Sequence, residues 1–592
     1  MKKNTLVLAC IVLSLISCNK NSDKDNMTIN ITFNQMLDEY YEDGLKLKPI
    51  DATFAGDSRY NNSFPNFLSD EYKSELKAYY SNYLGKLSQF NDEDLSDSEK
   101  ISKAVLKWEC EINLNRLTFR QELFPIDQMW SVNLIMGQFA SAYSAQPFNT
   151  VEDYNNWLQR LEGYLVWMDY AEMRMKEGME LGYVLPKSLI VKVIPQLEAL
   201  TVDDLENHLF YDPVKNFPES FSADDKKMLT KAYSTMLTEK LIPAYKRLYR
   251  FMSTDYLEAG RESSGIDAIP NGKAYYIHQI KTYTTTNMTA DEIHQLGLNE
   301  VARILLEMEK VKAEVGYEGD LRSFFDFVRD NKELMPFTKP EQVLDNFIVI
   351  QNRMKPQLEL LFDKEPKTAF EIRQTEAFRE ESASAEYNQG SVDGTRPGIF
   401  YVPIPDATKY NICSDESLFL HEAIPGHHYQ ISLTQENEDL PKFRKIIWYS
   451  GYGEGWALYS ESLGKELGLY TDPYQYFGML SAEMHRAIRL VVDTGLHAKG
   501  WTREQAIRYS LDNEAESEAN IISEIERYMA NPGQALSYKI GQLKIRELRT
   551  KAEKELGKNF DIREFHNQVL ETGCVPLAIL EDKINNWIAA SK

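Results

Sequence analysis

The stretch YNNWLQRLEGYLVWMDYAEMRMKEGMEL, residues 154–181, places apolar side chains three and four positions apart among charged ones. This spacing gathers the apolar residues on one face of a helix, because an α-helix turns once every 3.6 residues. The same pattern runs from about Thr32 to Asn346 and returns after Ser417, and strand signals are scarce. The sequence therefore predicts a mainly α-helical protein.

Two shorter segments refine this expectation. Thr289 precedes an apolar-periodic run and Glu292 follows it by three residues, which predicts a helix that begins with a capping box. Between Asp363 and Pro405, β-forming residues combine with glycine and proline, so a small β element is expected there. Glycine and proline also cluster in GIDAIPNGK, which predicts a division into an amino-terminal helical lobe, residues 31–270, and a catalytic lobe, residues 271–592.

The beginning of the chain has the layout of a secretory signal. Lysines precede the apolar run 6–16, which is too short to span a bilayer. The tetrad Leu15–Cys18 resembles a bacterial lipobox, which predicts a signal peptide over residues 1–17, lipidation of Cys18 and a polar tether over residues 18–30. The alternative is a plain signal peptide with an incidental cysteine. Either way, we expect an exported protein, and the lipobox interpretation places it in the bacterial cell envelope, held by a lipid anchor on Cys18.

Charge and cysteine content narrow the functional classes. The 66 basic and 90 acidic residues give a net charge of −24, which repels polyphosphate and makes nucleic acid an unlikely partner. Beyond the predicted anchor, only Cys110, Cys413 and Cys574 remain, and no CxxC spacing occurs. Disulfides are therefore not expected to be the main support of the fold.

Three of the nine histidines fall within SLFLHEAIPGHHYQ, residues 417–430. In the zinc motif H-E-x-x-H, two histidines share a helix face and the glutamate is the general base. Here the insertion Pro425-Gly426 delays the second histidine, which would lie about 240° round a straight helix from His421. A bulge that absorbs the insertion would make His421 and His427 the metal ligands, with His428 as the alternative. The competing interpretation is that the proline ends a helix and the histidines are structural.

A third ligand is expected from the helical run SGYGEGWALYSESLGKELG, residues 450–468. Glu454 opens this run and is the predicted ligand, whereas Glu461, two turns later, is predicted to support a ligand or to replace one. The alternative to a metal role is structural for both residues. Glu454 would then be a carboxylate at a helix start that the helix dipole stabilises, and Glu461 a solvated residue on the helix surface.

The predicted chemistry is hydrolysis by a water that Zn²⁺ activates. Glu422 would take the proton of this water and pass it to the leaving group. Tyr538 is the candidate donor to the developing oxyanion, and Lys539, Arg527 or Arg549 could hold a substrate carboxylate.

His485 and His497 are further candidates near the site, with Asp493 four residues before His497. The alternative for both is a satisfied structural group, as a lone helical histidine more often is. His208, His278, His294 and His566 stand in no comparable cluster, and no role is assigned to them.

Five motifs occur in order: YNQGSVDGTRPGIFYVP (387–403), HEAIPGHHYQ (421–430), EGWALYSE (454–461), RLVVDTGLHAKGW (489–501) and RYMANPGQALSYKIG (527–541). Together they resemble the bacterial domain-of-unknown-function family 885, which includes many lipoproteins and is thought to be related to helical zinc peptidases. The resemblance covers nearly all of the mature chain.

The resemblance implies a two-lobed helical fold akin to angiotensin-converting enzyme and thimet oligopeptidase, with a long cleft. A strand beside the zinc helix would then bind an extended peptide, and GSVDGTRPGIFYVP is the natural candidate. In it, Gly390 and Gly394 would allow close backbone approach and Arg396 would supply charge. The insertion Pro425-Gly426 departs from those peptidases and leaves the second ligand open between His427 and His428.

The sequence thus favours a zinc metallopeptidase that acts on short peptides. A metallohydrolase of another amide or ester would use the same water activation, and a non-catalytic, lipid-anchored peptide-binding protein would retain only the shape of the site.

Overall fold

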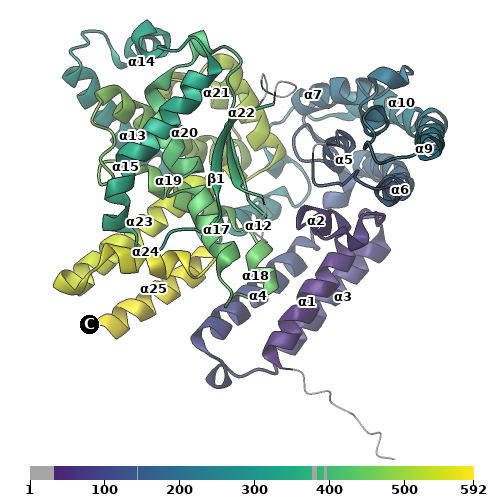
Figure 1. Ribbon diagram of the computed structural model, residues 1–592. Helices are drawn as coiled ribbons and strands as arrows, with labels where there is room; N and C mark the ends of the chain where they lie inside the picture. Colours follow the sequence, from purple (N-terminus) through teal and green to yellow (C-terminus); the bar gives the residue numbers. More distant parts are fainter. Residues whose placement is uncertain (1–31, 143, 377–379, 381–382, 392–395) are drawn as a thin grey trace, which may run out of the picture.

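The computed structural model describes residues 32–592 except for 143, 377–379, 381–382 and 392–395. Helices contain most of these residues, and the prediction of a mainly helical protein is confirmed (Figure 1). The predicted signal peptide, Cys18 and tether lie outside the described residues, as does Gly394. Among the residues described, no helix combines the length and the apolar character that crossing a membrane requires.

The helices before the sheet are α1 (Phe33–Leu47), α2 (Pro49–Phe54), α3 (Asp70–Leu87), α4 (Asp97–Arg116), α5 (Val132–Ala140), α6 (Val151–Leu181), α7 (Lys187–Glu198), α8 (Asp212–Lys215), α9 (Ala223–Met236), α10 (Ile242–Phe251), α11 (Leu257–Ala259), α12 (Gly272–Thr284), α13 (Ala290–Glu314), α14 (Leu321–Asp330) and α15 (Pro340–Leu361). The strands are β1 (Phe370–Gln374), β2 (Glu386–Asn388) and β3 (Gly398–Val402). The later helices are α16 (Asp415–Glu422), α17 (His427–Glu436), α18 (Lys442–Ile446), α19 (Ser450–Glu461), α20 (Pro473–Ala498), α21 (Arg503–Asn513), α22 (Glu518–Ala530), α23 (Ser537–Leu556), α24 (Ile562–Leu570) and α25 (Leu577–Ser591).

Local sequence signals place two of the longer helices. The stretch 154–181 forms most of α6, whose apolar face is buried and whose carboxyl end is Gly182 in the left-handed conformation. Helix α13 begins with the expected capping box. The Thr289 side chain accepts a hydrogen bond from the amide of Glu292, and the Glu292 side chain accepts one from the amide of Thr289. Both predictions are confirmed.

The small sheet lies between Asp363 and Pro405, as predicted, in the order β1-β3-β2. Strand β3 is central, parallel to β1 and antiparallel to β2. The strand expected over residues 390–403 is shorter than predicted and begins at Gly398. Pro397 cannot donate a ladder hydrogen bond, and the carbonyl of Arg396 accepts its hydrogen bond from the amide of Ser391 rather than from a neighbouring strand.

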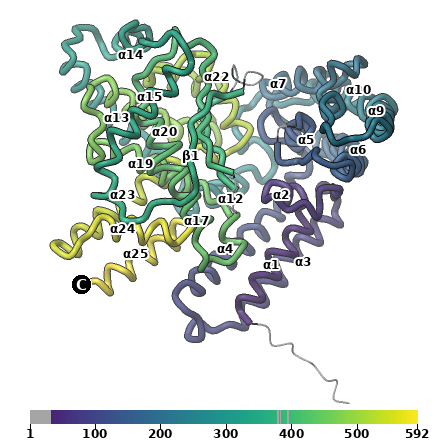
Figure 2. Tube along the Cα trace, in the orientation of Figure 1, coloured from purple at the N-terminus to yellow at the C-terminus, as the bar shows by residue number. Residues whose placement is uncertain are grey.

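Two hydrophobic cores hold the helices together. The smaller core draws on residues between Ile50 and Tyr256, mostly from α5, α6, α7, α9 and α10, which gather at one side of the molecule (Figure 2). The larger core joins α1, α3 and α4 to the later part of the chain, up to Ile588. The cores are therefore not two consecutive halves of the sequence, and the boundary near residue 270 stays a prediction.

Helices α19 and α23 touch backbone to backbone. A Cβ atom added at Gly455 would lie 2.5 Å from Cα of Gly541, and one added at Gly541 would lie 1.9 Å from the carbonyl oxygen of Gly451. Only glycine permits so close an approach at these positions. The contact fixes Glu454 of α19 relative to Tyr538 of α23.

Candidate metal centre

The run that carries the clustered histidines is two helices rather than one. Helix α16 ends at Glu422 and α17 begins at His427, so the expectation of a single bulged helix is wrong. Pro425 has no amide hydrogen, so it cannot donate the hydrogen bond that would continue the helix. Its carbonyl accepts a hydrogen bond of 2.8 Å from Nε1 of Trp456. Gly426 is pressed against the preceding turn, where an added Cβ would lie 1.9 Å from the carbonyl oxygen of His421.

This break brings the two predicted histidines beside the predicted glutamate. Nε2 of His421 lies 3.6 Å from Oε2 of Glu454, and Nε2 of His427 lies 3.3 Å from the same oxygen. One ligand atom from each of the three residues lies within 4.8 Å of the other two. The imidazole rings are perpendicular, with centroids 4.9 Å apart. Three side chains from α16, α17 and α19 thus converge on one point.

The converging atoms suit a zinc ion. Zinc holds nitrogen and oxygen ligands at about 2.0–2.2 Å in a tetrahedron, which places two ligands of one ion about 3.3–3.5 Å apart. The separations of 3.3 and 3.6 Å at Glu454 are close to this spacing. Two histidines and a glutamate are also a usual donor set of catalytic zinc sites, which leave a fourth position for water or substrate.

Glu461 supports the cluster from behind. Its Oε1 lies 2.7 Å from Nδ1 of His421, so the other nitrogen of the ring is directed at Glu454. A carboxylate behind a ligating histidine fixes the tautomer and the ring orientation. Glu461 therefore holds His421 rather than completing the group of three. Nδ1 of His427, in contrast, is buried and has no hydrogen-bond partner among the described residues.

His428 points away from the cluster. Its Nδ1 lies 3.0 Å from the hydroxyl of Tyr387 and 3.3 Å from that of Ser432, and its ring packs on Phe370 of β1. Burial lowers the pKa of His428 to about 4. Of the two candidates for the second ligand, the structure brings only His427 to Glu454.

The charges of the cluster depend on one another. Burial acts to lower the pKa of His421, but the hydrogen bonds to Glu454 and Glu461 outweigh it and raise this pKa to about 10. Burial acts to raise the pKa of Glu454, yet the charge of His427 and the hydrogen bond from His421 hold it well below its usual range. Burial dominates at Glu422, whose pKa is raised.

The cluster opens into a cavity of about 810 Å³. Glu422 and Tyr538 line it, as their predicted roles require, together with His485. His497 is fully enclosed between the amide of Ile266 and the carbonyl of Tyr528, which is a structural role. Sequence reasoning missed several further lining residues: Trp448, Arg486, Arg489, Glu516, Asn520, Ser523 and Glu524.

A helical spacing could have found part of this set. On α20, Arg489 lies four residues after His485 and three after Arg486, so its side chain neighbours both of theirs on the helix surface. Glu524 and Arg527 are three residues apart on α22, so their side chains are also neighbours on one helix face.

Two of the proposed substrate-binding cations lie elsewhere. Lys539 is fully buried and pairs with Glu483 at 2.7 Å, so the expectation that it meets a substrate is wrong. Arg549 pairs with Glu466 outside the cavity. The charge of Lys539 is neutralised within the core, because an unpaired buried ammonium would be far too costly.

Arg527 lines the cavity, whereas Gly390 and Arg396 are absent from the described lining. The loop between Gly390 and Arg396 is only partly described, and their assignment stays a prediction.

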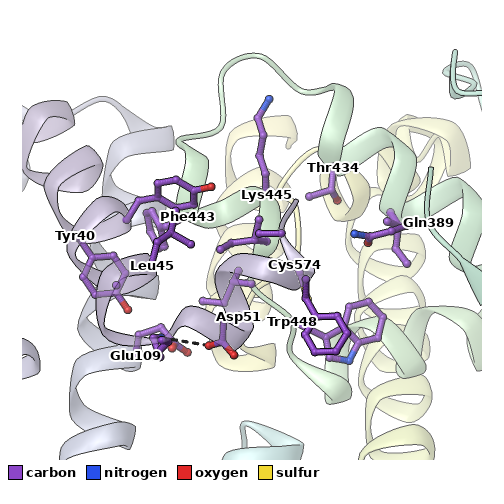
Figure 3. A pocket seen from close by; sticks show the side chains of 18 of the residues that line it. Tyr40, Leu45, Asp51, Glu109, Gln389, Thr434, Phe443, Lys445, Trp448 and Cys574 are labelled. Atoms are coloured by element: carbon purple, nitrogen blue, oxygen red, sulfur yellow. Dashed lines mark ion pairs between the residues drawn. The ribbon is translucent and has the colours of Figure 1, made fainter. Parts of the chain in front are cut away.

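Figure 3 shows a second cavity, which has a volume of about 540 Å³. Ile431 and Trp448 line both cavities. Tyr40 and Leu45 of α1 face Thr434 and Trp448 across it. The amino-terminal helices therefore contribute an aromatic and apolar wall next to the metal cluster, and the ring of Trp448 lies 5.9 Å from that of His427.

Comparison with known proteins finds similarity over most of the chain. A family model described as bacterial protein of unknown function (DUF885) matches residues 49–584. No curated protein matches the chain. A crystal structure from Colwellia psychrerythraea, provisionally described as that of a lipoprotein, is 28% identical, with a TM-score of 0.85 over 94% of this chain and 99% of that one. A structure from Shewanella oneidensis with a similar description, of unknown function, is 19% identical, with a TM-score of 0.73 over 93% and 99%.

Proposed function

The chain belongs to the DUF885 family of bacterial proteins of unknown function, and we propose from its site that it is a zinc-dependent hydrolase, most specifically a metallopeptidase. The observation that carries the proposal is the convergence of His421, His427 and Glu454, whose ligand atoms lie within 4.8 Å of one another. Glu422 lines the same cavity and is not part of this group, so it is available as a base. The likeness of the family to helical zinc peptidases, with a cleft between two lobes, is part of the same proposal.

Each residue of the site has a role in this proposal. Zinc, when bound, supplies Lewis acidity that acidifies water and polarises a carbonyl group. Glu422 takes a proton from the attacking water and passes it to the leaving amine, a role that its raised pKa favours. Tyr538 donates its hydroxyl proton to the oxyanion that develops on the substrate.

Short peptides are the substrate class that the cavities fit best. The adjoining spaces of about 810 and 540 Å³ can hold a few side chains in line past Trp448. Strand β2 forms an edge of the sheet and Tyr387 of β2 lines the larger cavity, so an extended peptide has a strand to pair with.

We place the protein in the bacterial cell envelope. The two related structures are provisionally described as lipoproteins, and Cys18 stands at the end of a lipobox-like tetrad. An acyl anchor on Cys18 would tether the helical body to a membrane surface.

A substrate screen tests the function. Purified protein loaded with one equivalent of zinc is incubated with mixed short peptides, acyl amino acids, small amides and esters, and the products are identified by mass spectrometry. Peptide cleavage is expected. Cleavage of the small amides or esters alone would favour the other metallohydrolase, and peptide binding without cleavage would favour the binding protein. Absence of both zinc binding and turnover would overturn the proposal.

Zinc affinity should rise with pH. His421 has a pKa raised to about 10 in the metal-free protein, so it carries a proton near neutrality that a metal ion must displace. We expect the apparent Kd for zinc to fall by about tenfold for each pH unit between pH 6 and 9. Competition with a chelator of known affinity measures this slope. A Kd that does not change with pH would contradict the assigned role of His421.

Glu461→Gln should weaken zinc binding without unfolding the protein. The amide can still accept the bond from His421, but it lacks the charge that makes the imidazole a stronger ligand. We expect an affinity loss of about 10- to 100-fold, measured by the same competition. Glu466→Gln is the matched control, because Glu466 pairs with Arg549 on the outside. If the two variants bind zinc with equal affinity, Glu461 does not support the metal site.

A further inference from the structure

Three arginines stand in the wall of the metal cavity. Arg486 and Arg489 come from α20 and Arg527 from α22. Each has a buried guanidinium nitrogen without a hydrogen-bond partner among the described residues: Nε of Arg486, Nη1 of Arg489 and Nε of Arg527. Buried donors are nearly always satisfied, so this concentration in one cavity points to a missing acceptor.

Arg489 is held rigidly with one nitrogen left over. Its Nε donates to the hydroxyl of Tyr528 at 3.0 Å and its Nη2 to Glu524 at 2.8 Å. The guanidinium also lies 4.6 Å from the ring centre of Tyr538. Only 5% of the residue is exposed, it lines the cavity, and its Nη1 is buried without a hydrogen-bond partner among the described residues. A carboxylate that reached this nitrogen from the cavity would satisfy a donor that is costly to leave unpaired.

Arg486 makes no ion pair among the described residues, although its charge acts to lower the pKa of Glu422 in the same cavity. Among the described residues, its Nη1 donates a hydrogen bond of 3.3 Å to the carbonyl of Ala482, one turn back on α20. Within the described part of the chain, no carboxylate lies at ion-pair distance from it, whereas Arg489 and Arg527 share Glu524 and His485 pairs with Glu514. In a chain of net charge −24, a cation left unpaired in a cavity requires an explanation.

We propose that Arg486 and Arg489 form a carboxylate-binding subsite in the cavity that holds His421, His427 and Glu454. The inference rests on the proposed hydrolase function and narrows its substrates to peptides that present a carboxylate next to the bond to be cleaved. Guanidinium groups bind carboxylates through paired, charge-assisted hydrogen bonds, which are roughly twice as strong as neutral ones.

A carboxylate suits the subsite better than a phosphate. Glu422, Glu516 and Glu524 line the same cavity, so a dianion would meet stronger repulsion than a monoanion. Two sources can supply the carboxylate: the carboxyl terminus of a peptide or an aspartate or glutamate side chain. The first source would make the protein an exopeptidase that works from the carboxyl end.

Matched peptides distinguish these sources. A neutral peptide is assayed with a free carboxyl terminus and with a terminal amide, and a third peptide combines the amide with a glutamate side chain. We expect the free acid to be cleaved with a kcat/KM about 10- to 100-fold above that of the neutral amide. If the glutamate peptide with a terminal amide is cleaved as fast as the free acid, a side chain can supply the carboxylate that the subsite binds. Equal cleavage of all three would overturn the inference and leave the hydrolase function standing.

The variant Arg486→Gln tests the same point from the protein side. Arg486 makes no ion pair within the fold, so its replacement should leave the melting temperature unchanged. We expect the ratio of kcat/KM for the acid to kcat/KM for the neutral amide to fall about tenfold, because only the acid loses a charge-assisted hydrogen bond. Arg508→Gln is the control, because Arg508 is 74% exposed and pairs with Asp512 on the surface. An equal loss on the acid and the amide substrate would contradict a carboxylate subsite.

Binding without turnover separates this inference from the proposed chemistry. Calorimetry on Glu422→Gln with the acid and amide peptides reports recognition even where no bond is broken. Tighter binding of the acid supports the subsite whether or not the protein is a peptidase. Equal affinity for the two peptides in this variant, beside normal peptide cleavage by the native protein, refutes the subsite alone.

Discussion

Glu422→Gln should bind zinc like the native protein and hydrolyse peptides about 10²- to 10⁴-fold more slowly. The carboxylate lines the cavity but does not belong to the group formed by His421, His427 and Glu454. Glutamine keeps the shape of the side chain and cannot accept the proton of the attacking water. Burial raises the pKa of Glu422, so the native carboxylate is a better base than an exposed one.

Steady-state kinetics together with zinc analysis measures this effect. Glu438→Gln, which alters an exposed glutamate beyond α17, should retain full activity. If Glu422→Gln loses zinc in proportion to activity, the residue belongs to the metal site rather than to proton transfer. If it keeps both zinc and activity, another group is the base.

Gly426→Ala should abolish zinc binding while most of the fold persists. The added Cβ would lie 1.9 Å from the carbonyl oxygen of His421 and 2.3 Å from that of Leu420. Relief of this overlap requires backbone movement between α16 and α17, which costs about 1–3 kcal/mol and separates His421 from His427. We expect zinc affinity to fall by at least about 100-fold, since a ligand displaced from Glu454 no longer shares the ion.

Gly85→Ala is the matched control for this variant. Gly85 lies within α3 and an added Cβ meets nothing within 4 Å. Alanine there should raise the unfolding free energy by about 0.5–1 kcal/mol, because it restricts the unfolded chain. Zinc affinity should not change. A Gly426→Ala protein that binds zinc normally would show that the break between the two helices tolerates displacement.

Local patterns carried much of the sequence-based prediction. Helix α6 and the start of α13 depend on periodicity and capping within a few residues, so the sequence alone located them. His421, His427 and Glu454 were found because zinc chemistry restricts both residue type and spacing. His427 was chosen for the wrong geometric reason, since the insertion breaks the helix instead of widening it.

Long-range packing explains what the sequence left open. Lys539 follows Tyr538 directly, yet α23 turns it into the core toward Glu483 and Glu300. The free nitrogens of Arg486 and Arg489 become visible only when α20, α22 and α23 are assembled. Neither outcome follows from spacing along the chain, because each depends on which helix covers which face.

The contact between α19 and α23 also limits how the site can move. Glu454 lies between Gly451 and Gly455, whose backbones rest against Gly541, and Tyr538 is one turn before that glycine. Two helices in backbone contact have no side-chain layer along which to slide, so we expect the backbones that carry the ligand and the hydroxyl donor to move as one rigid body. We therefore expect the cavity to change shape at its other walls when a substrate enters and leaves.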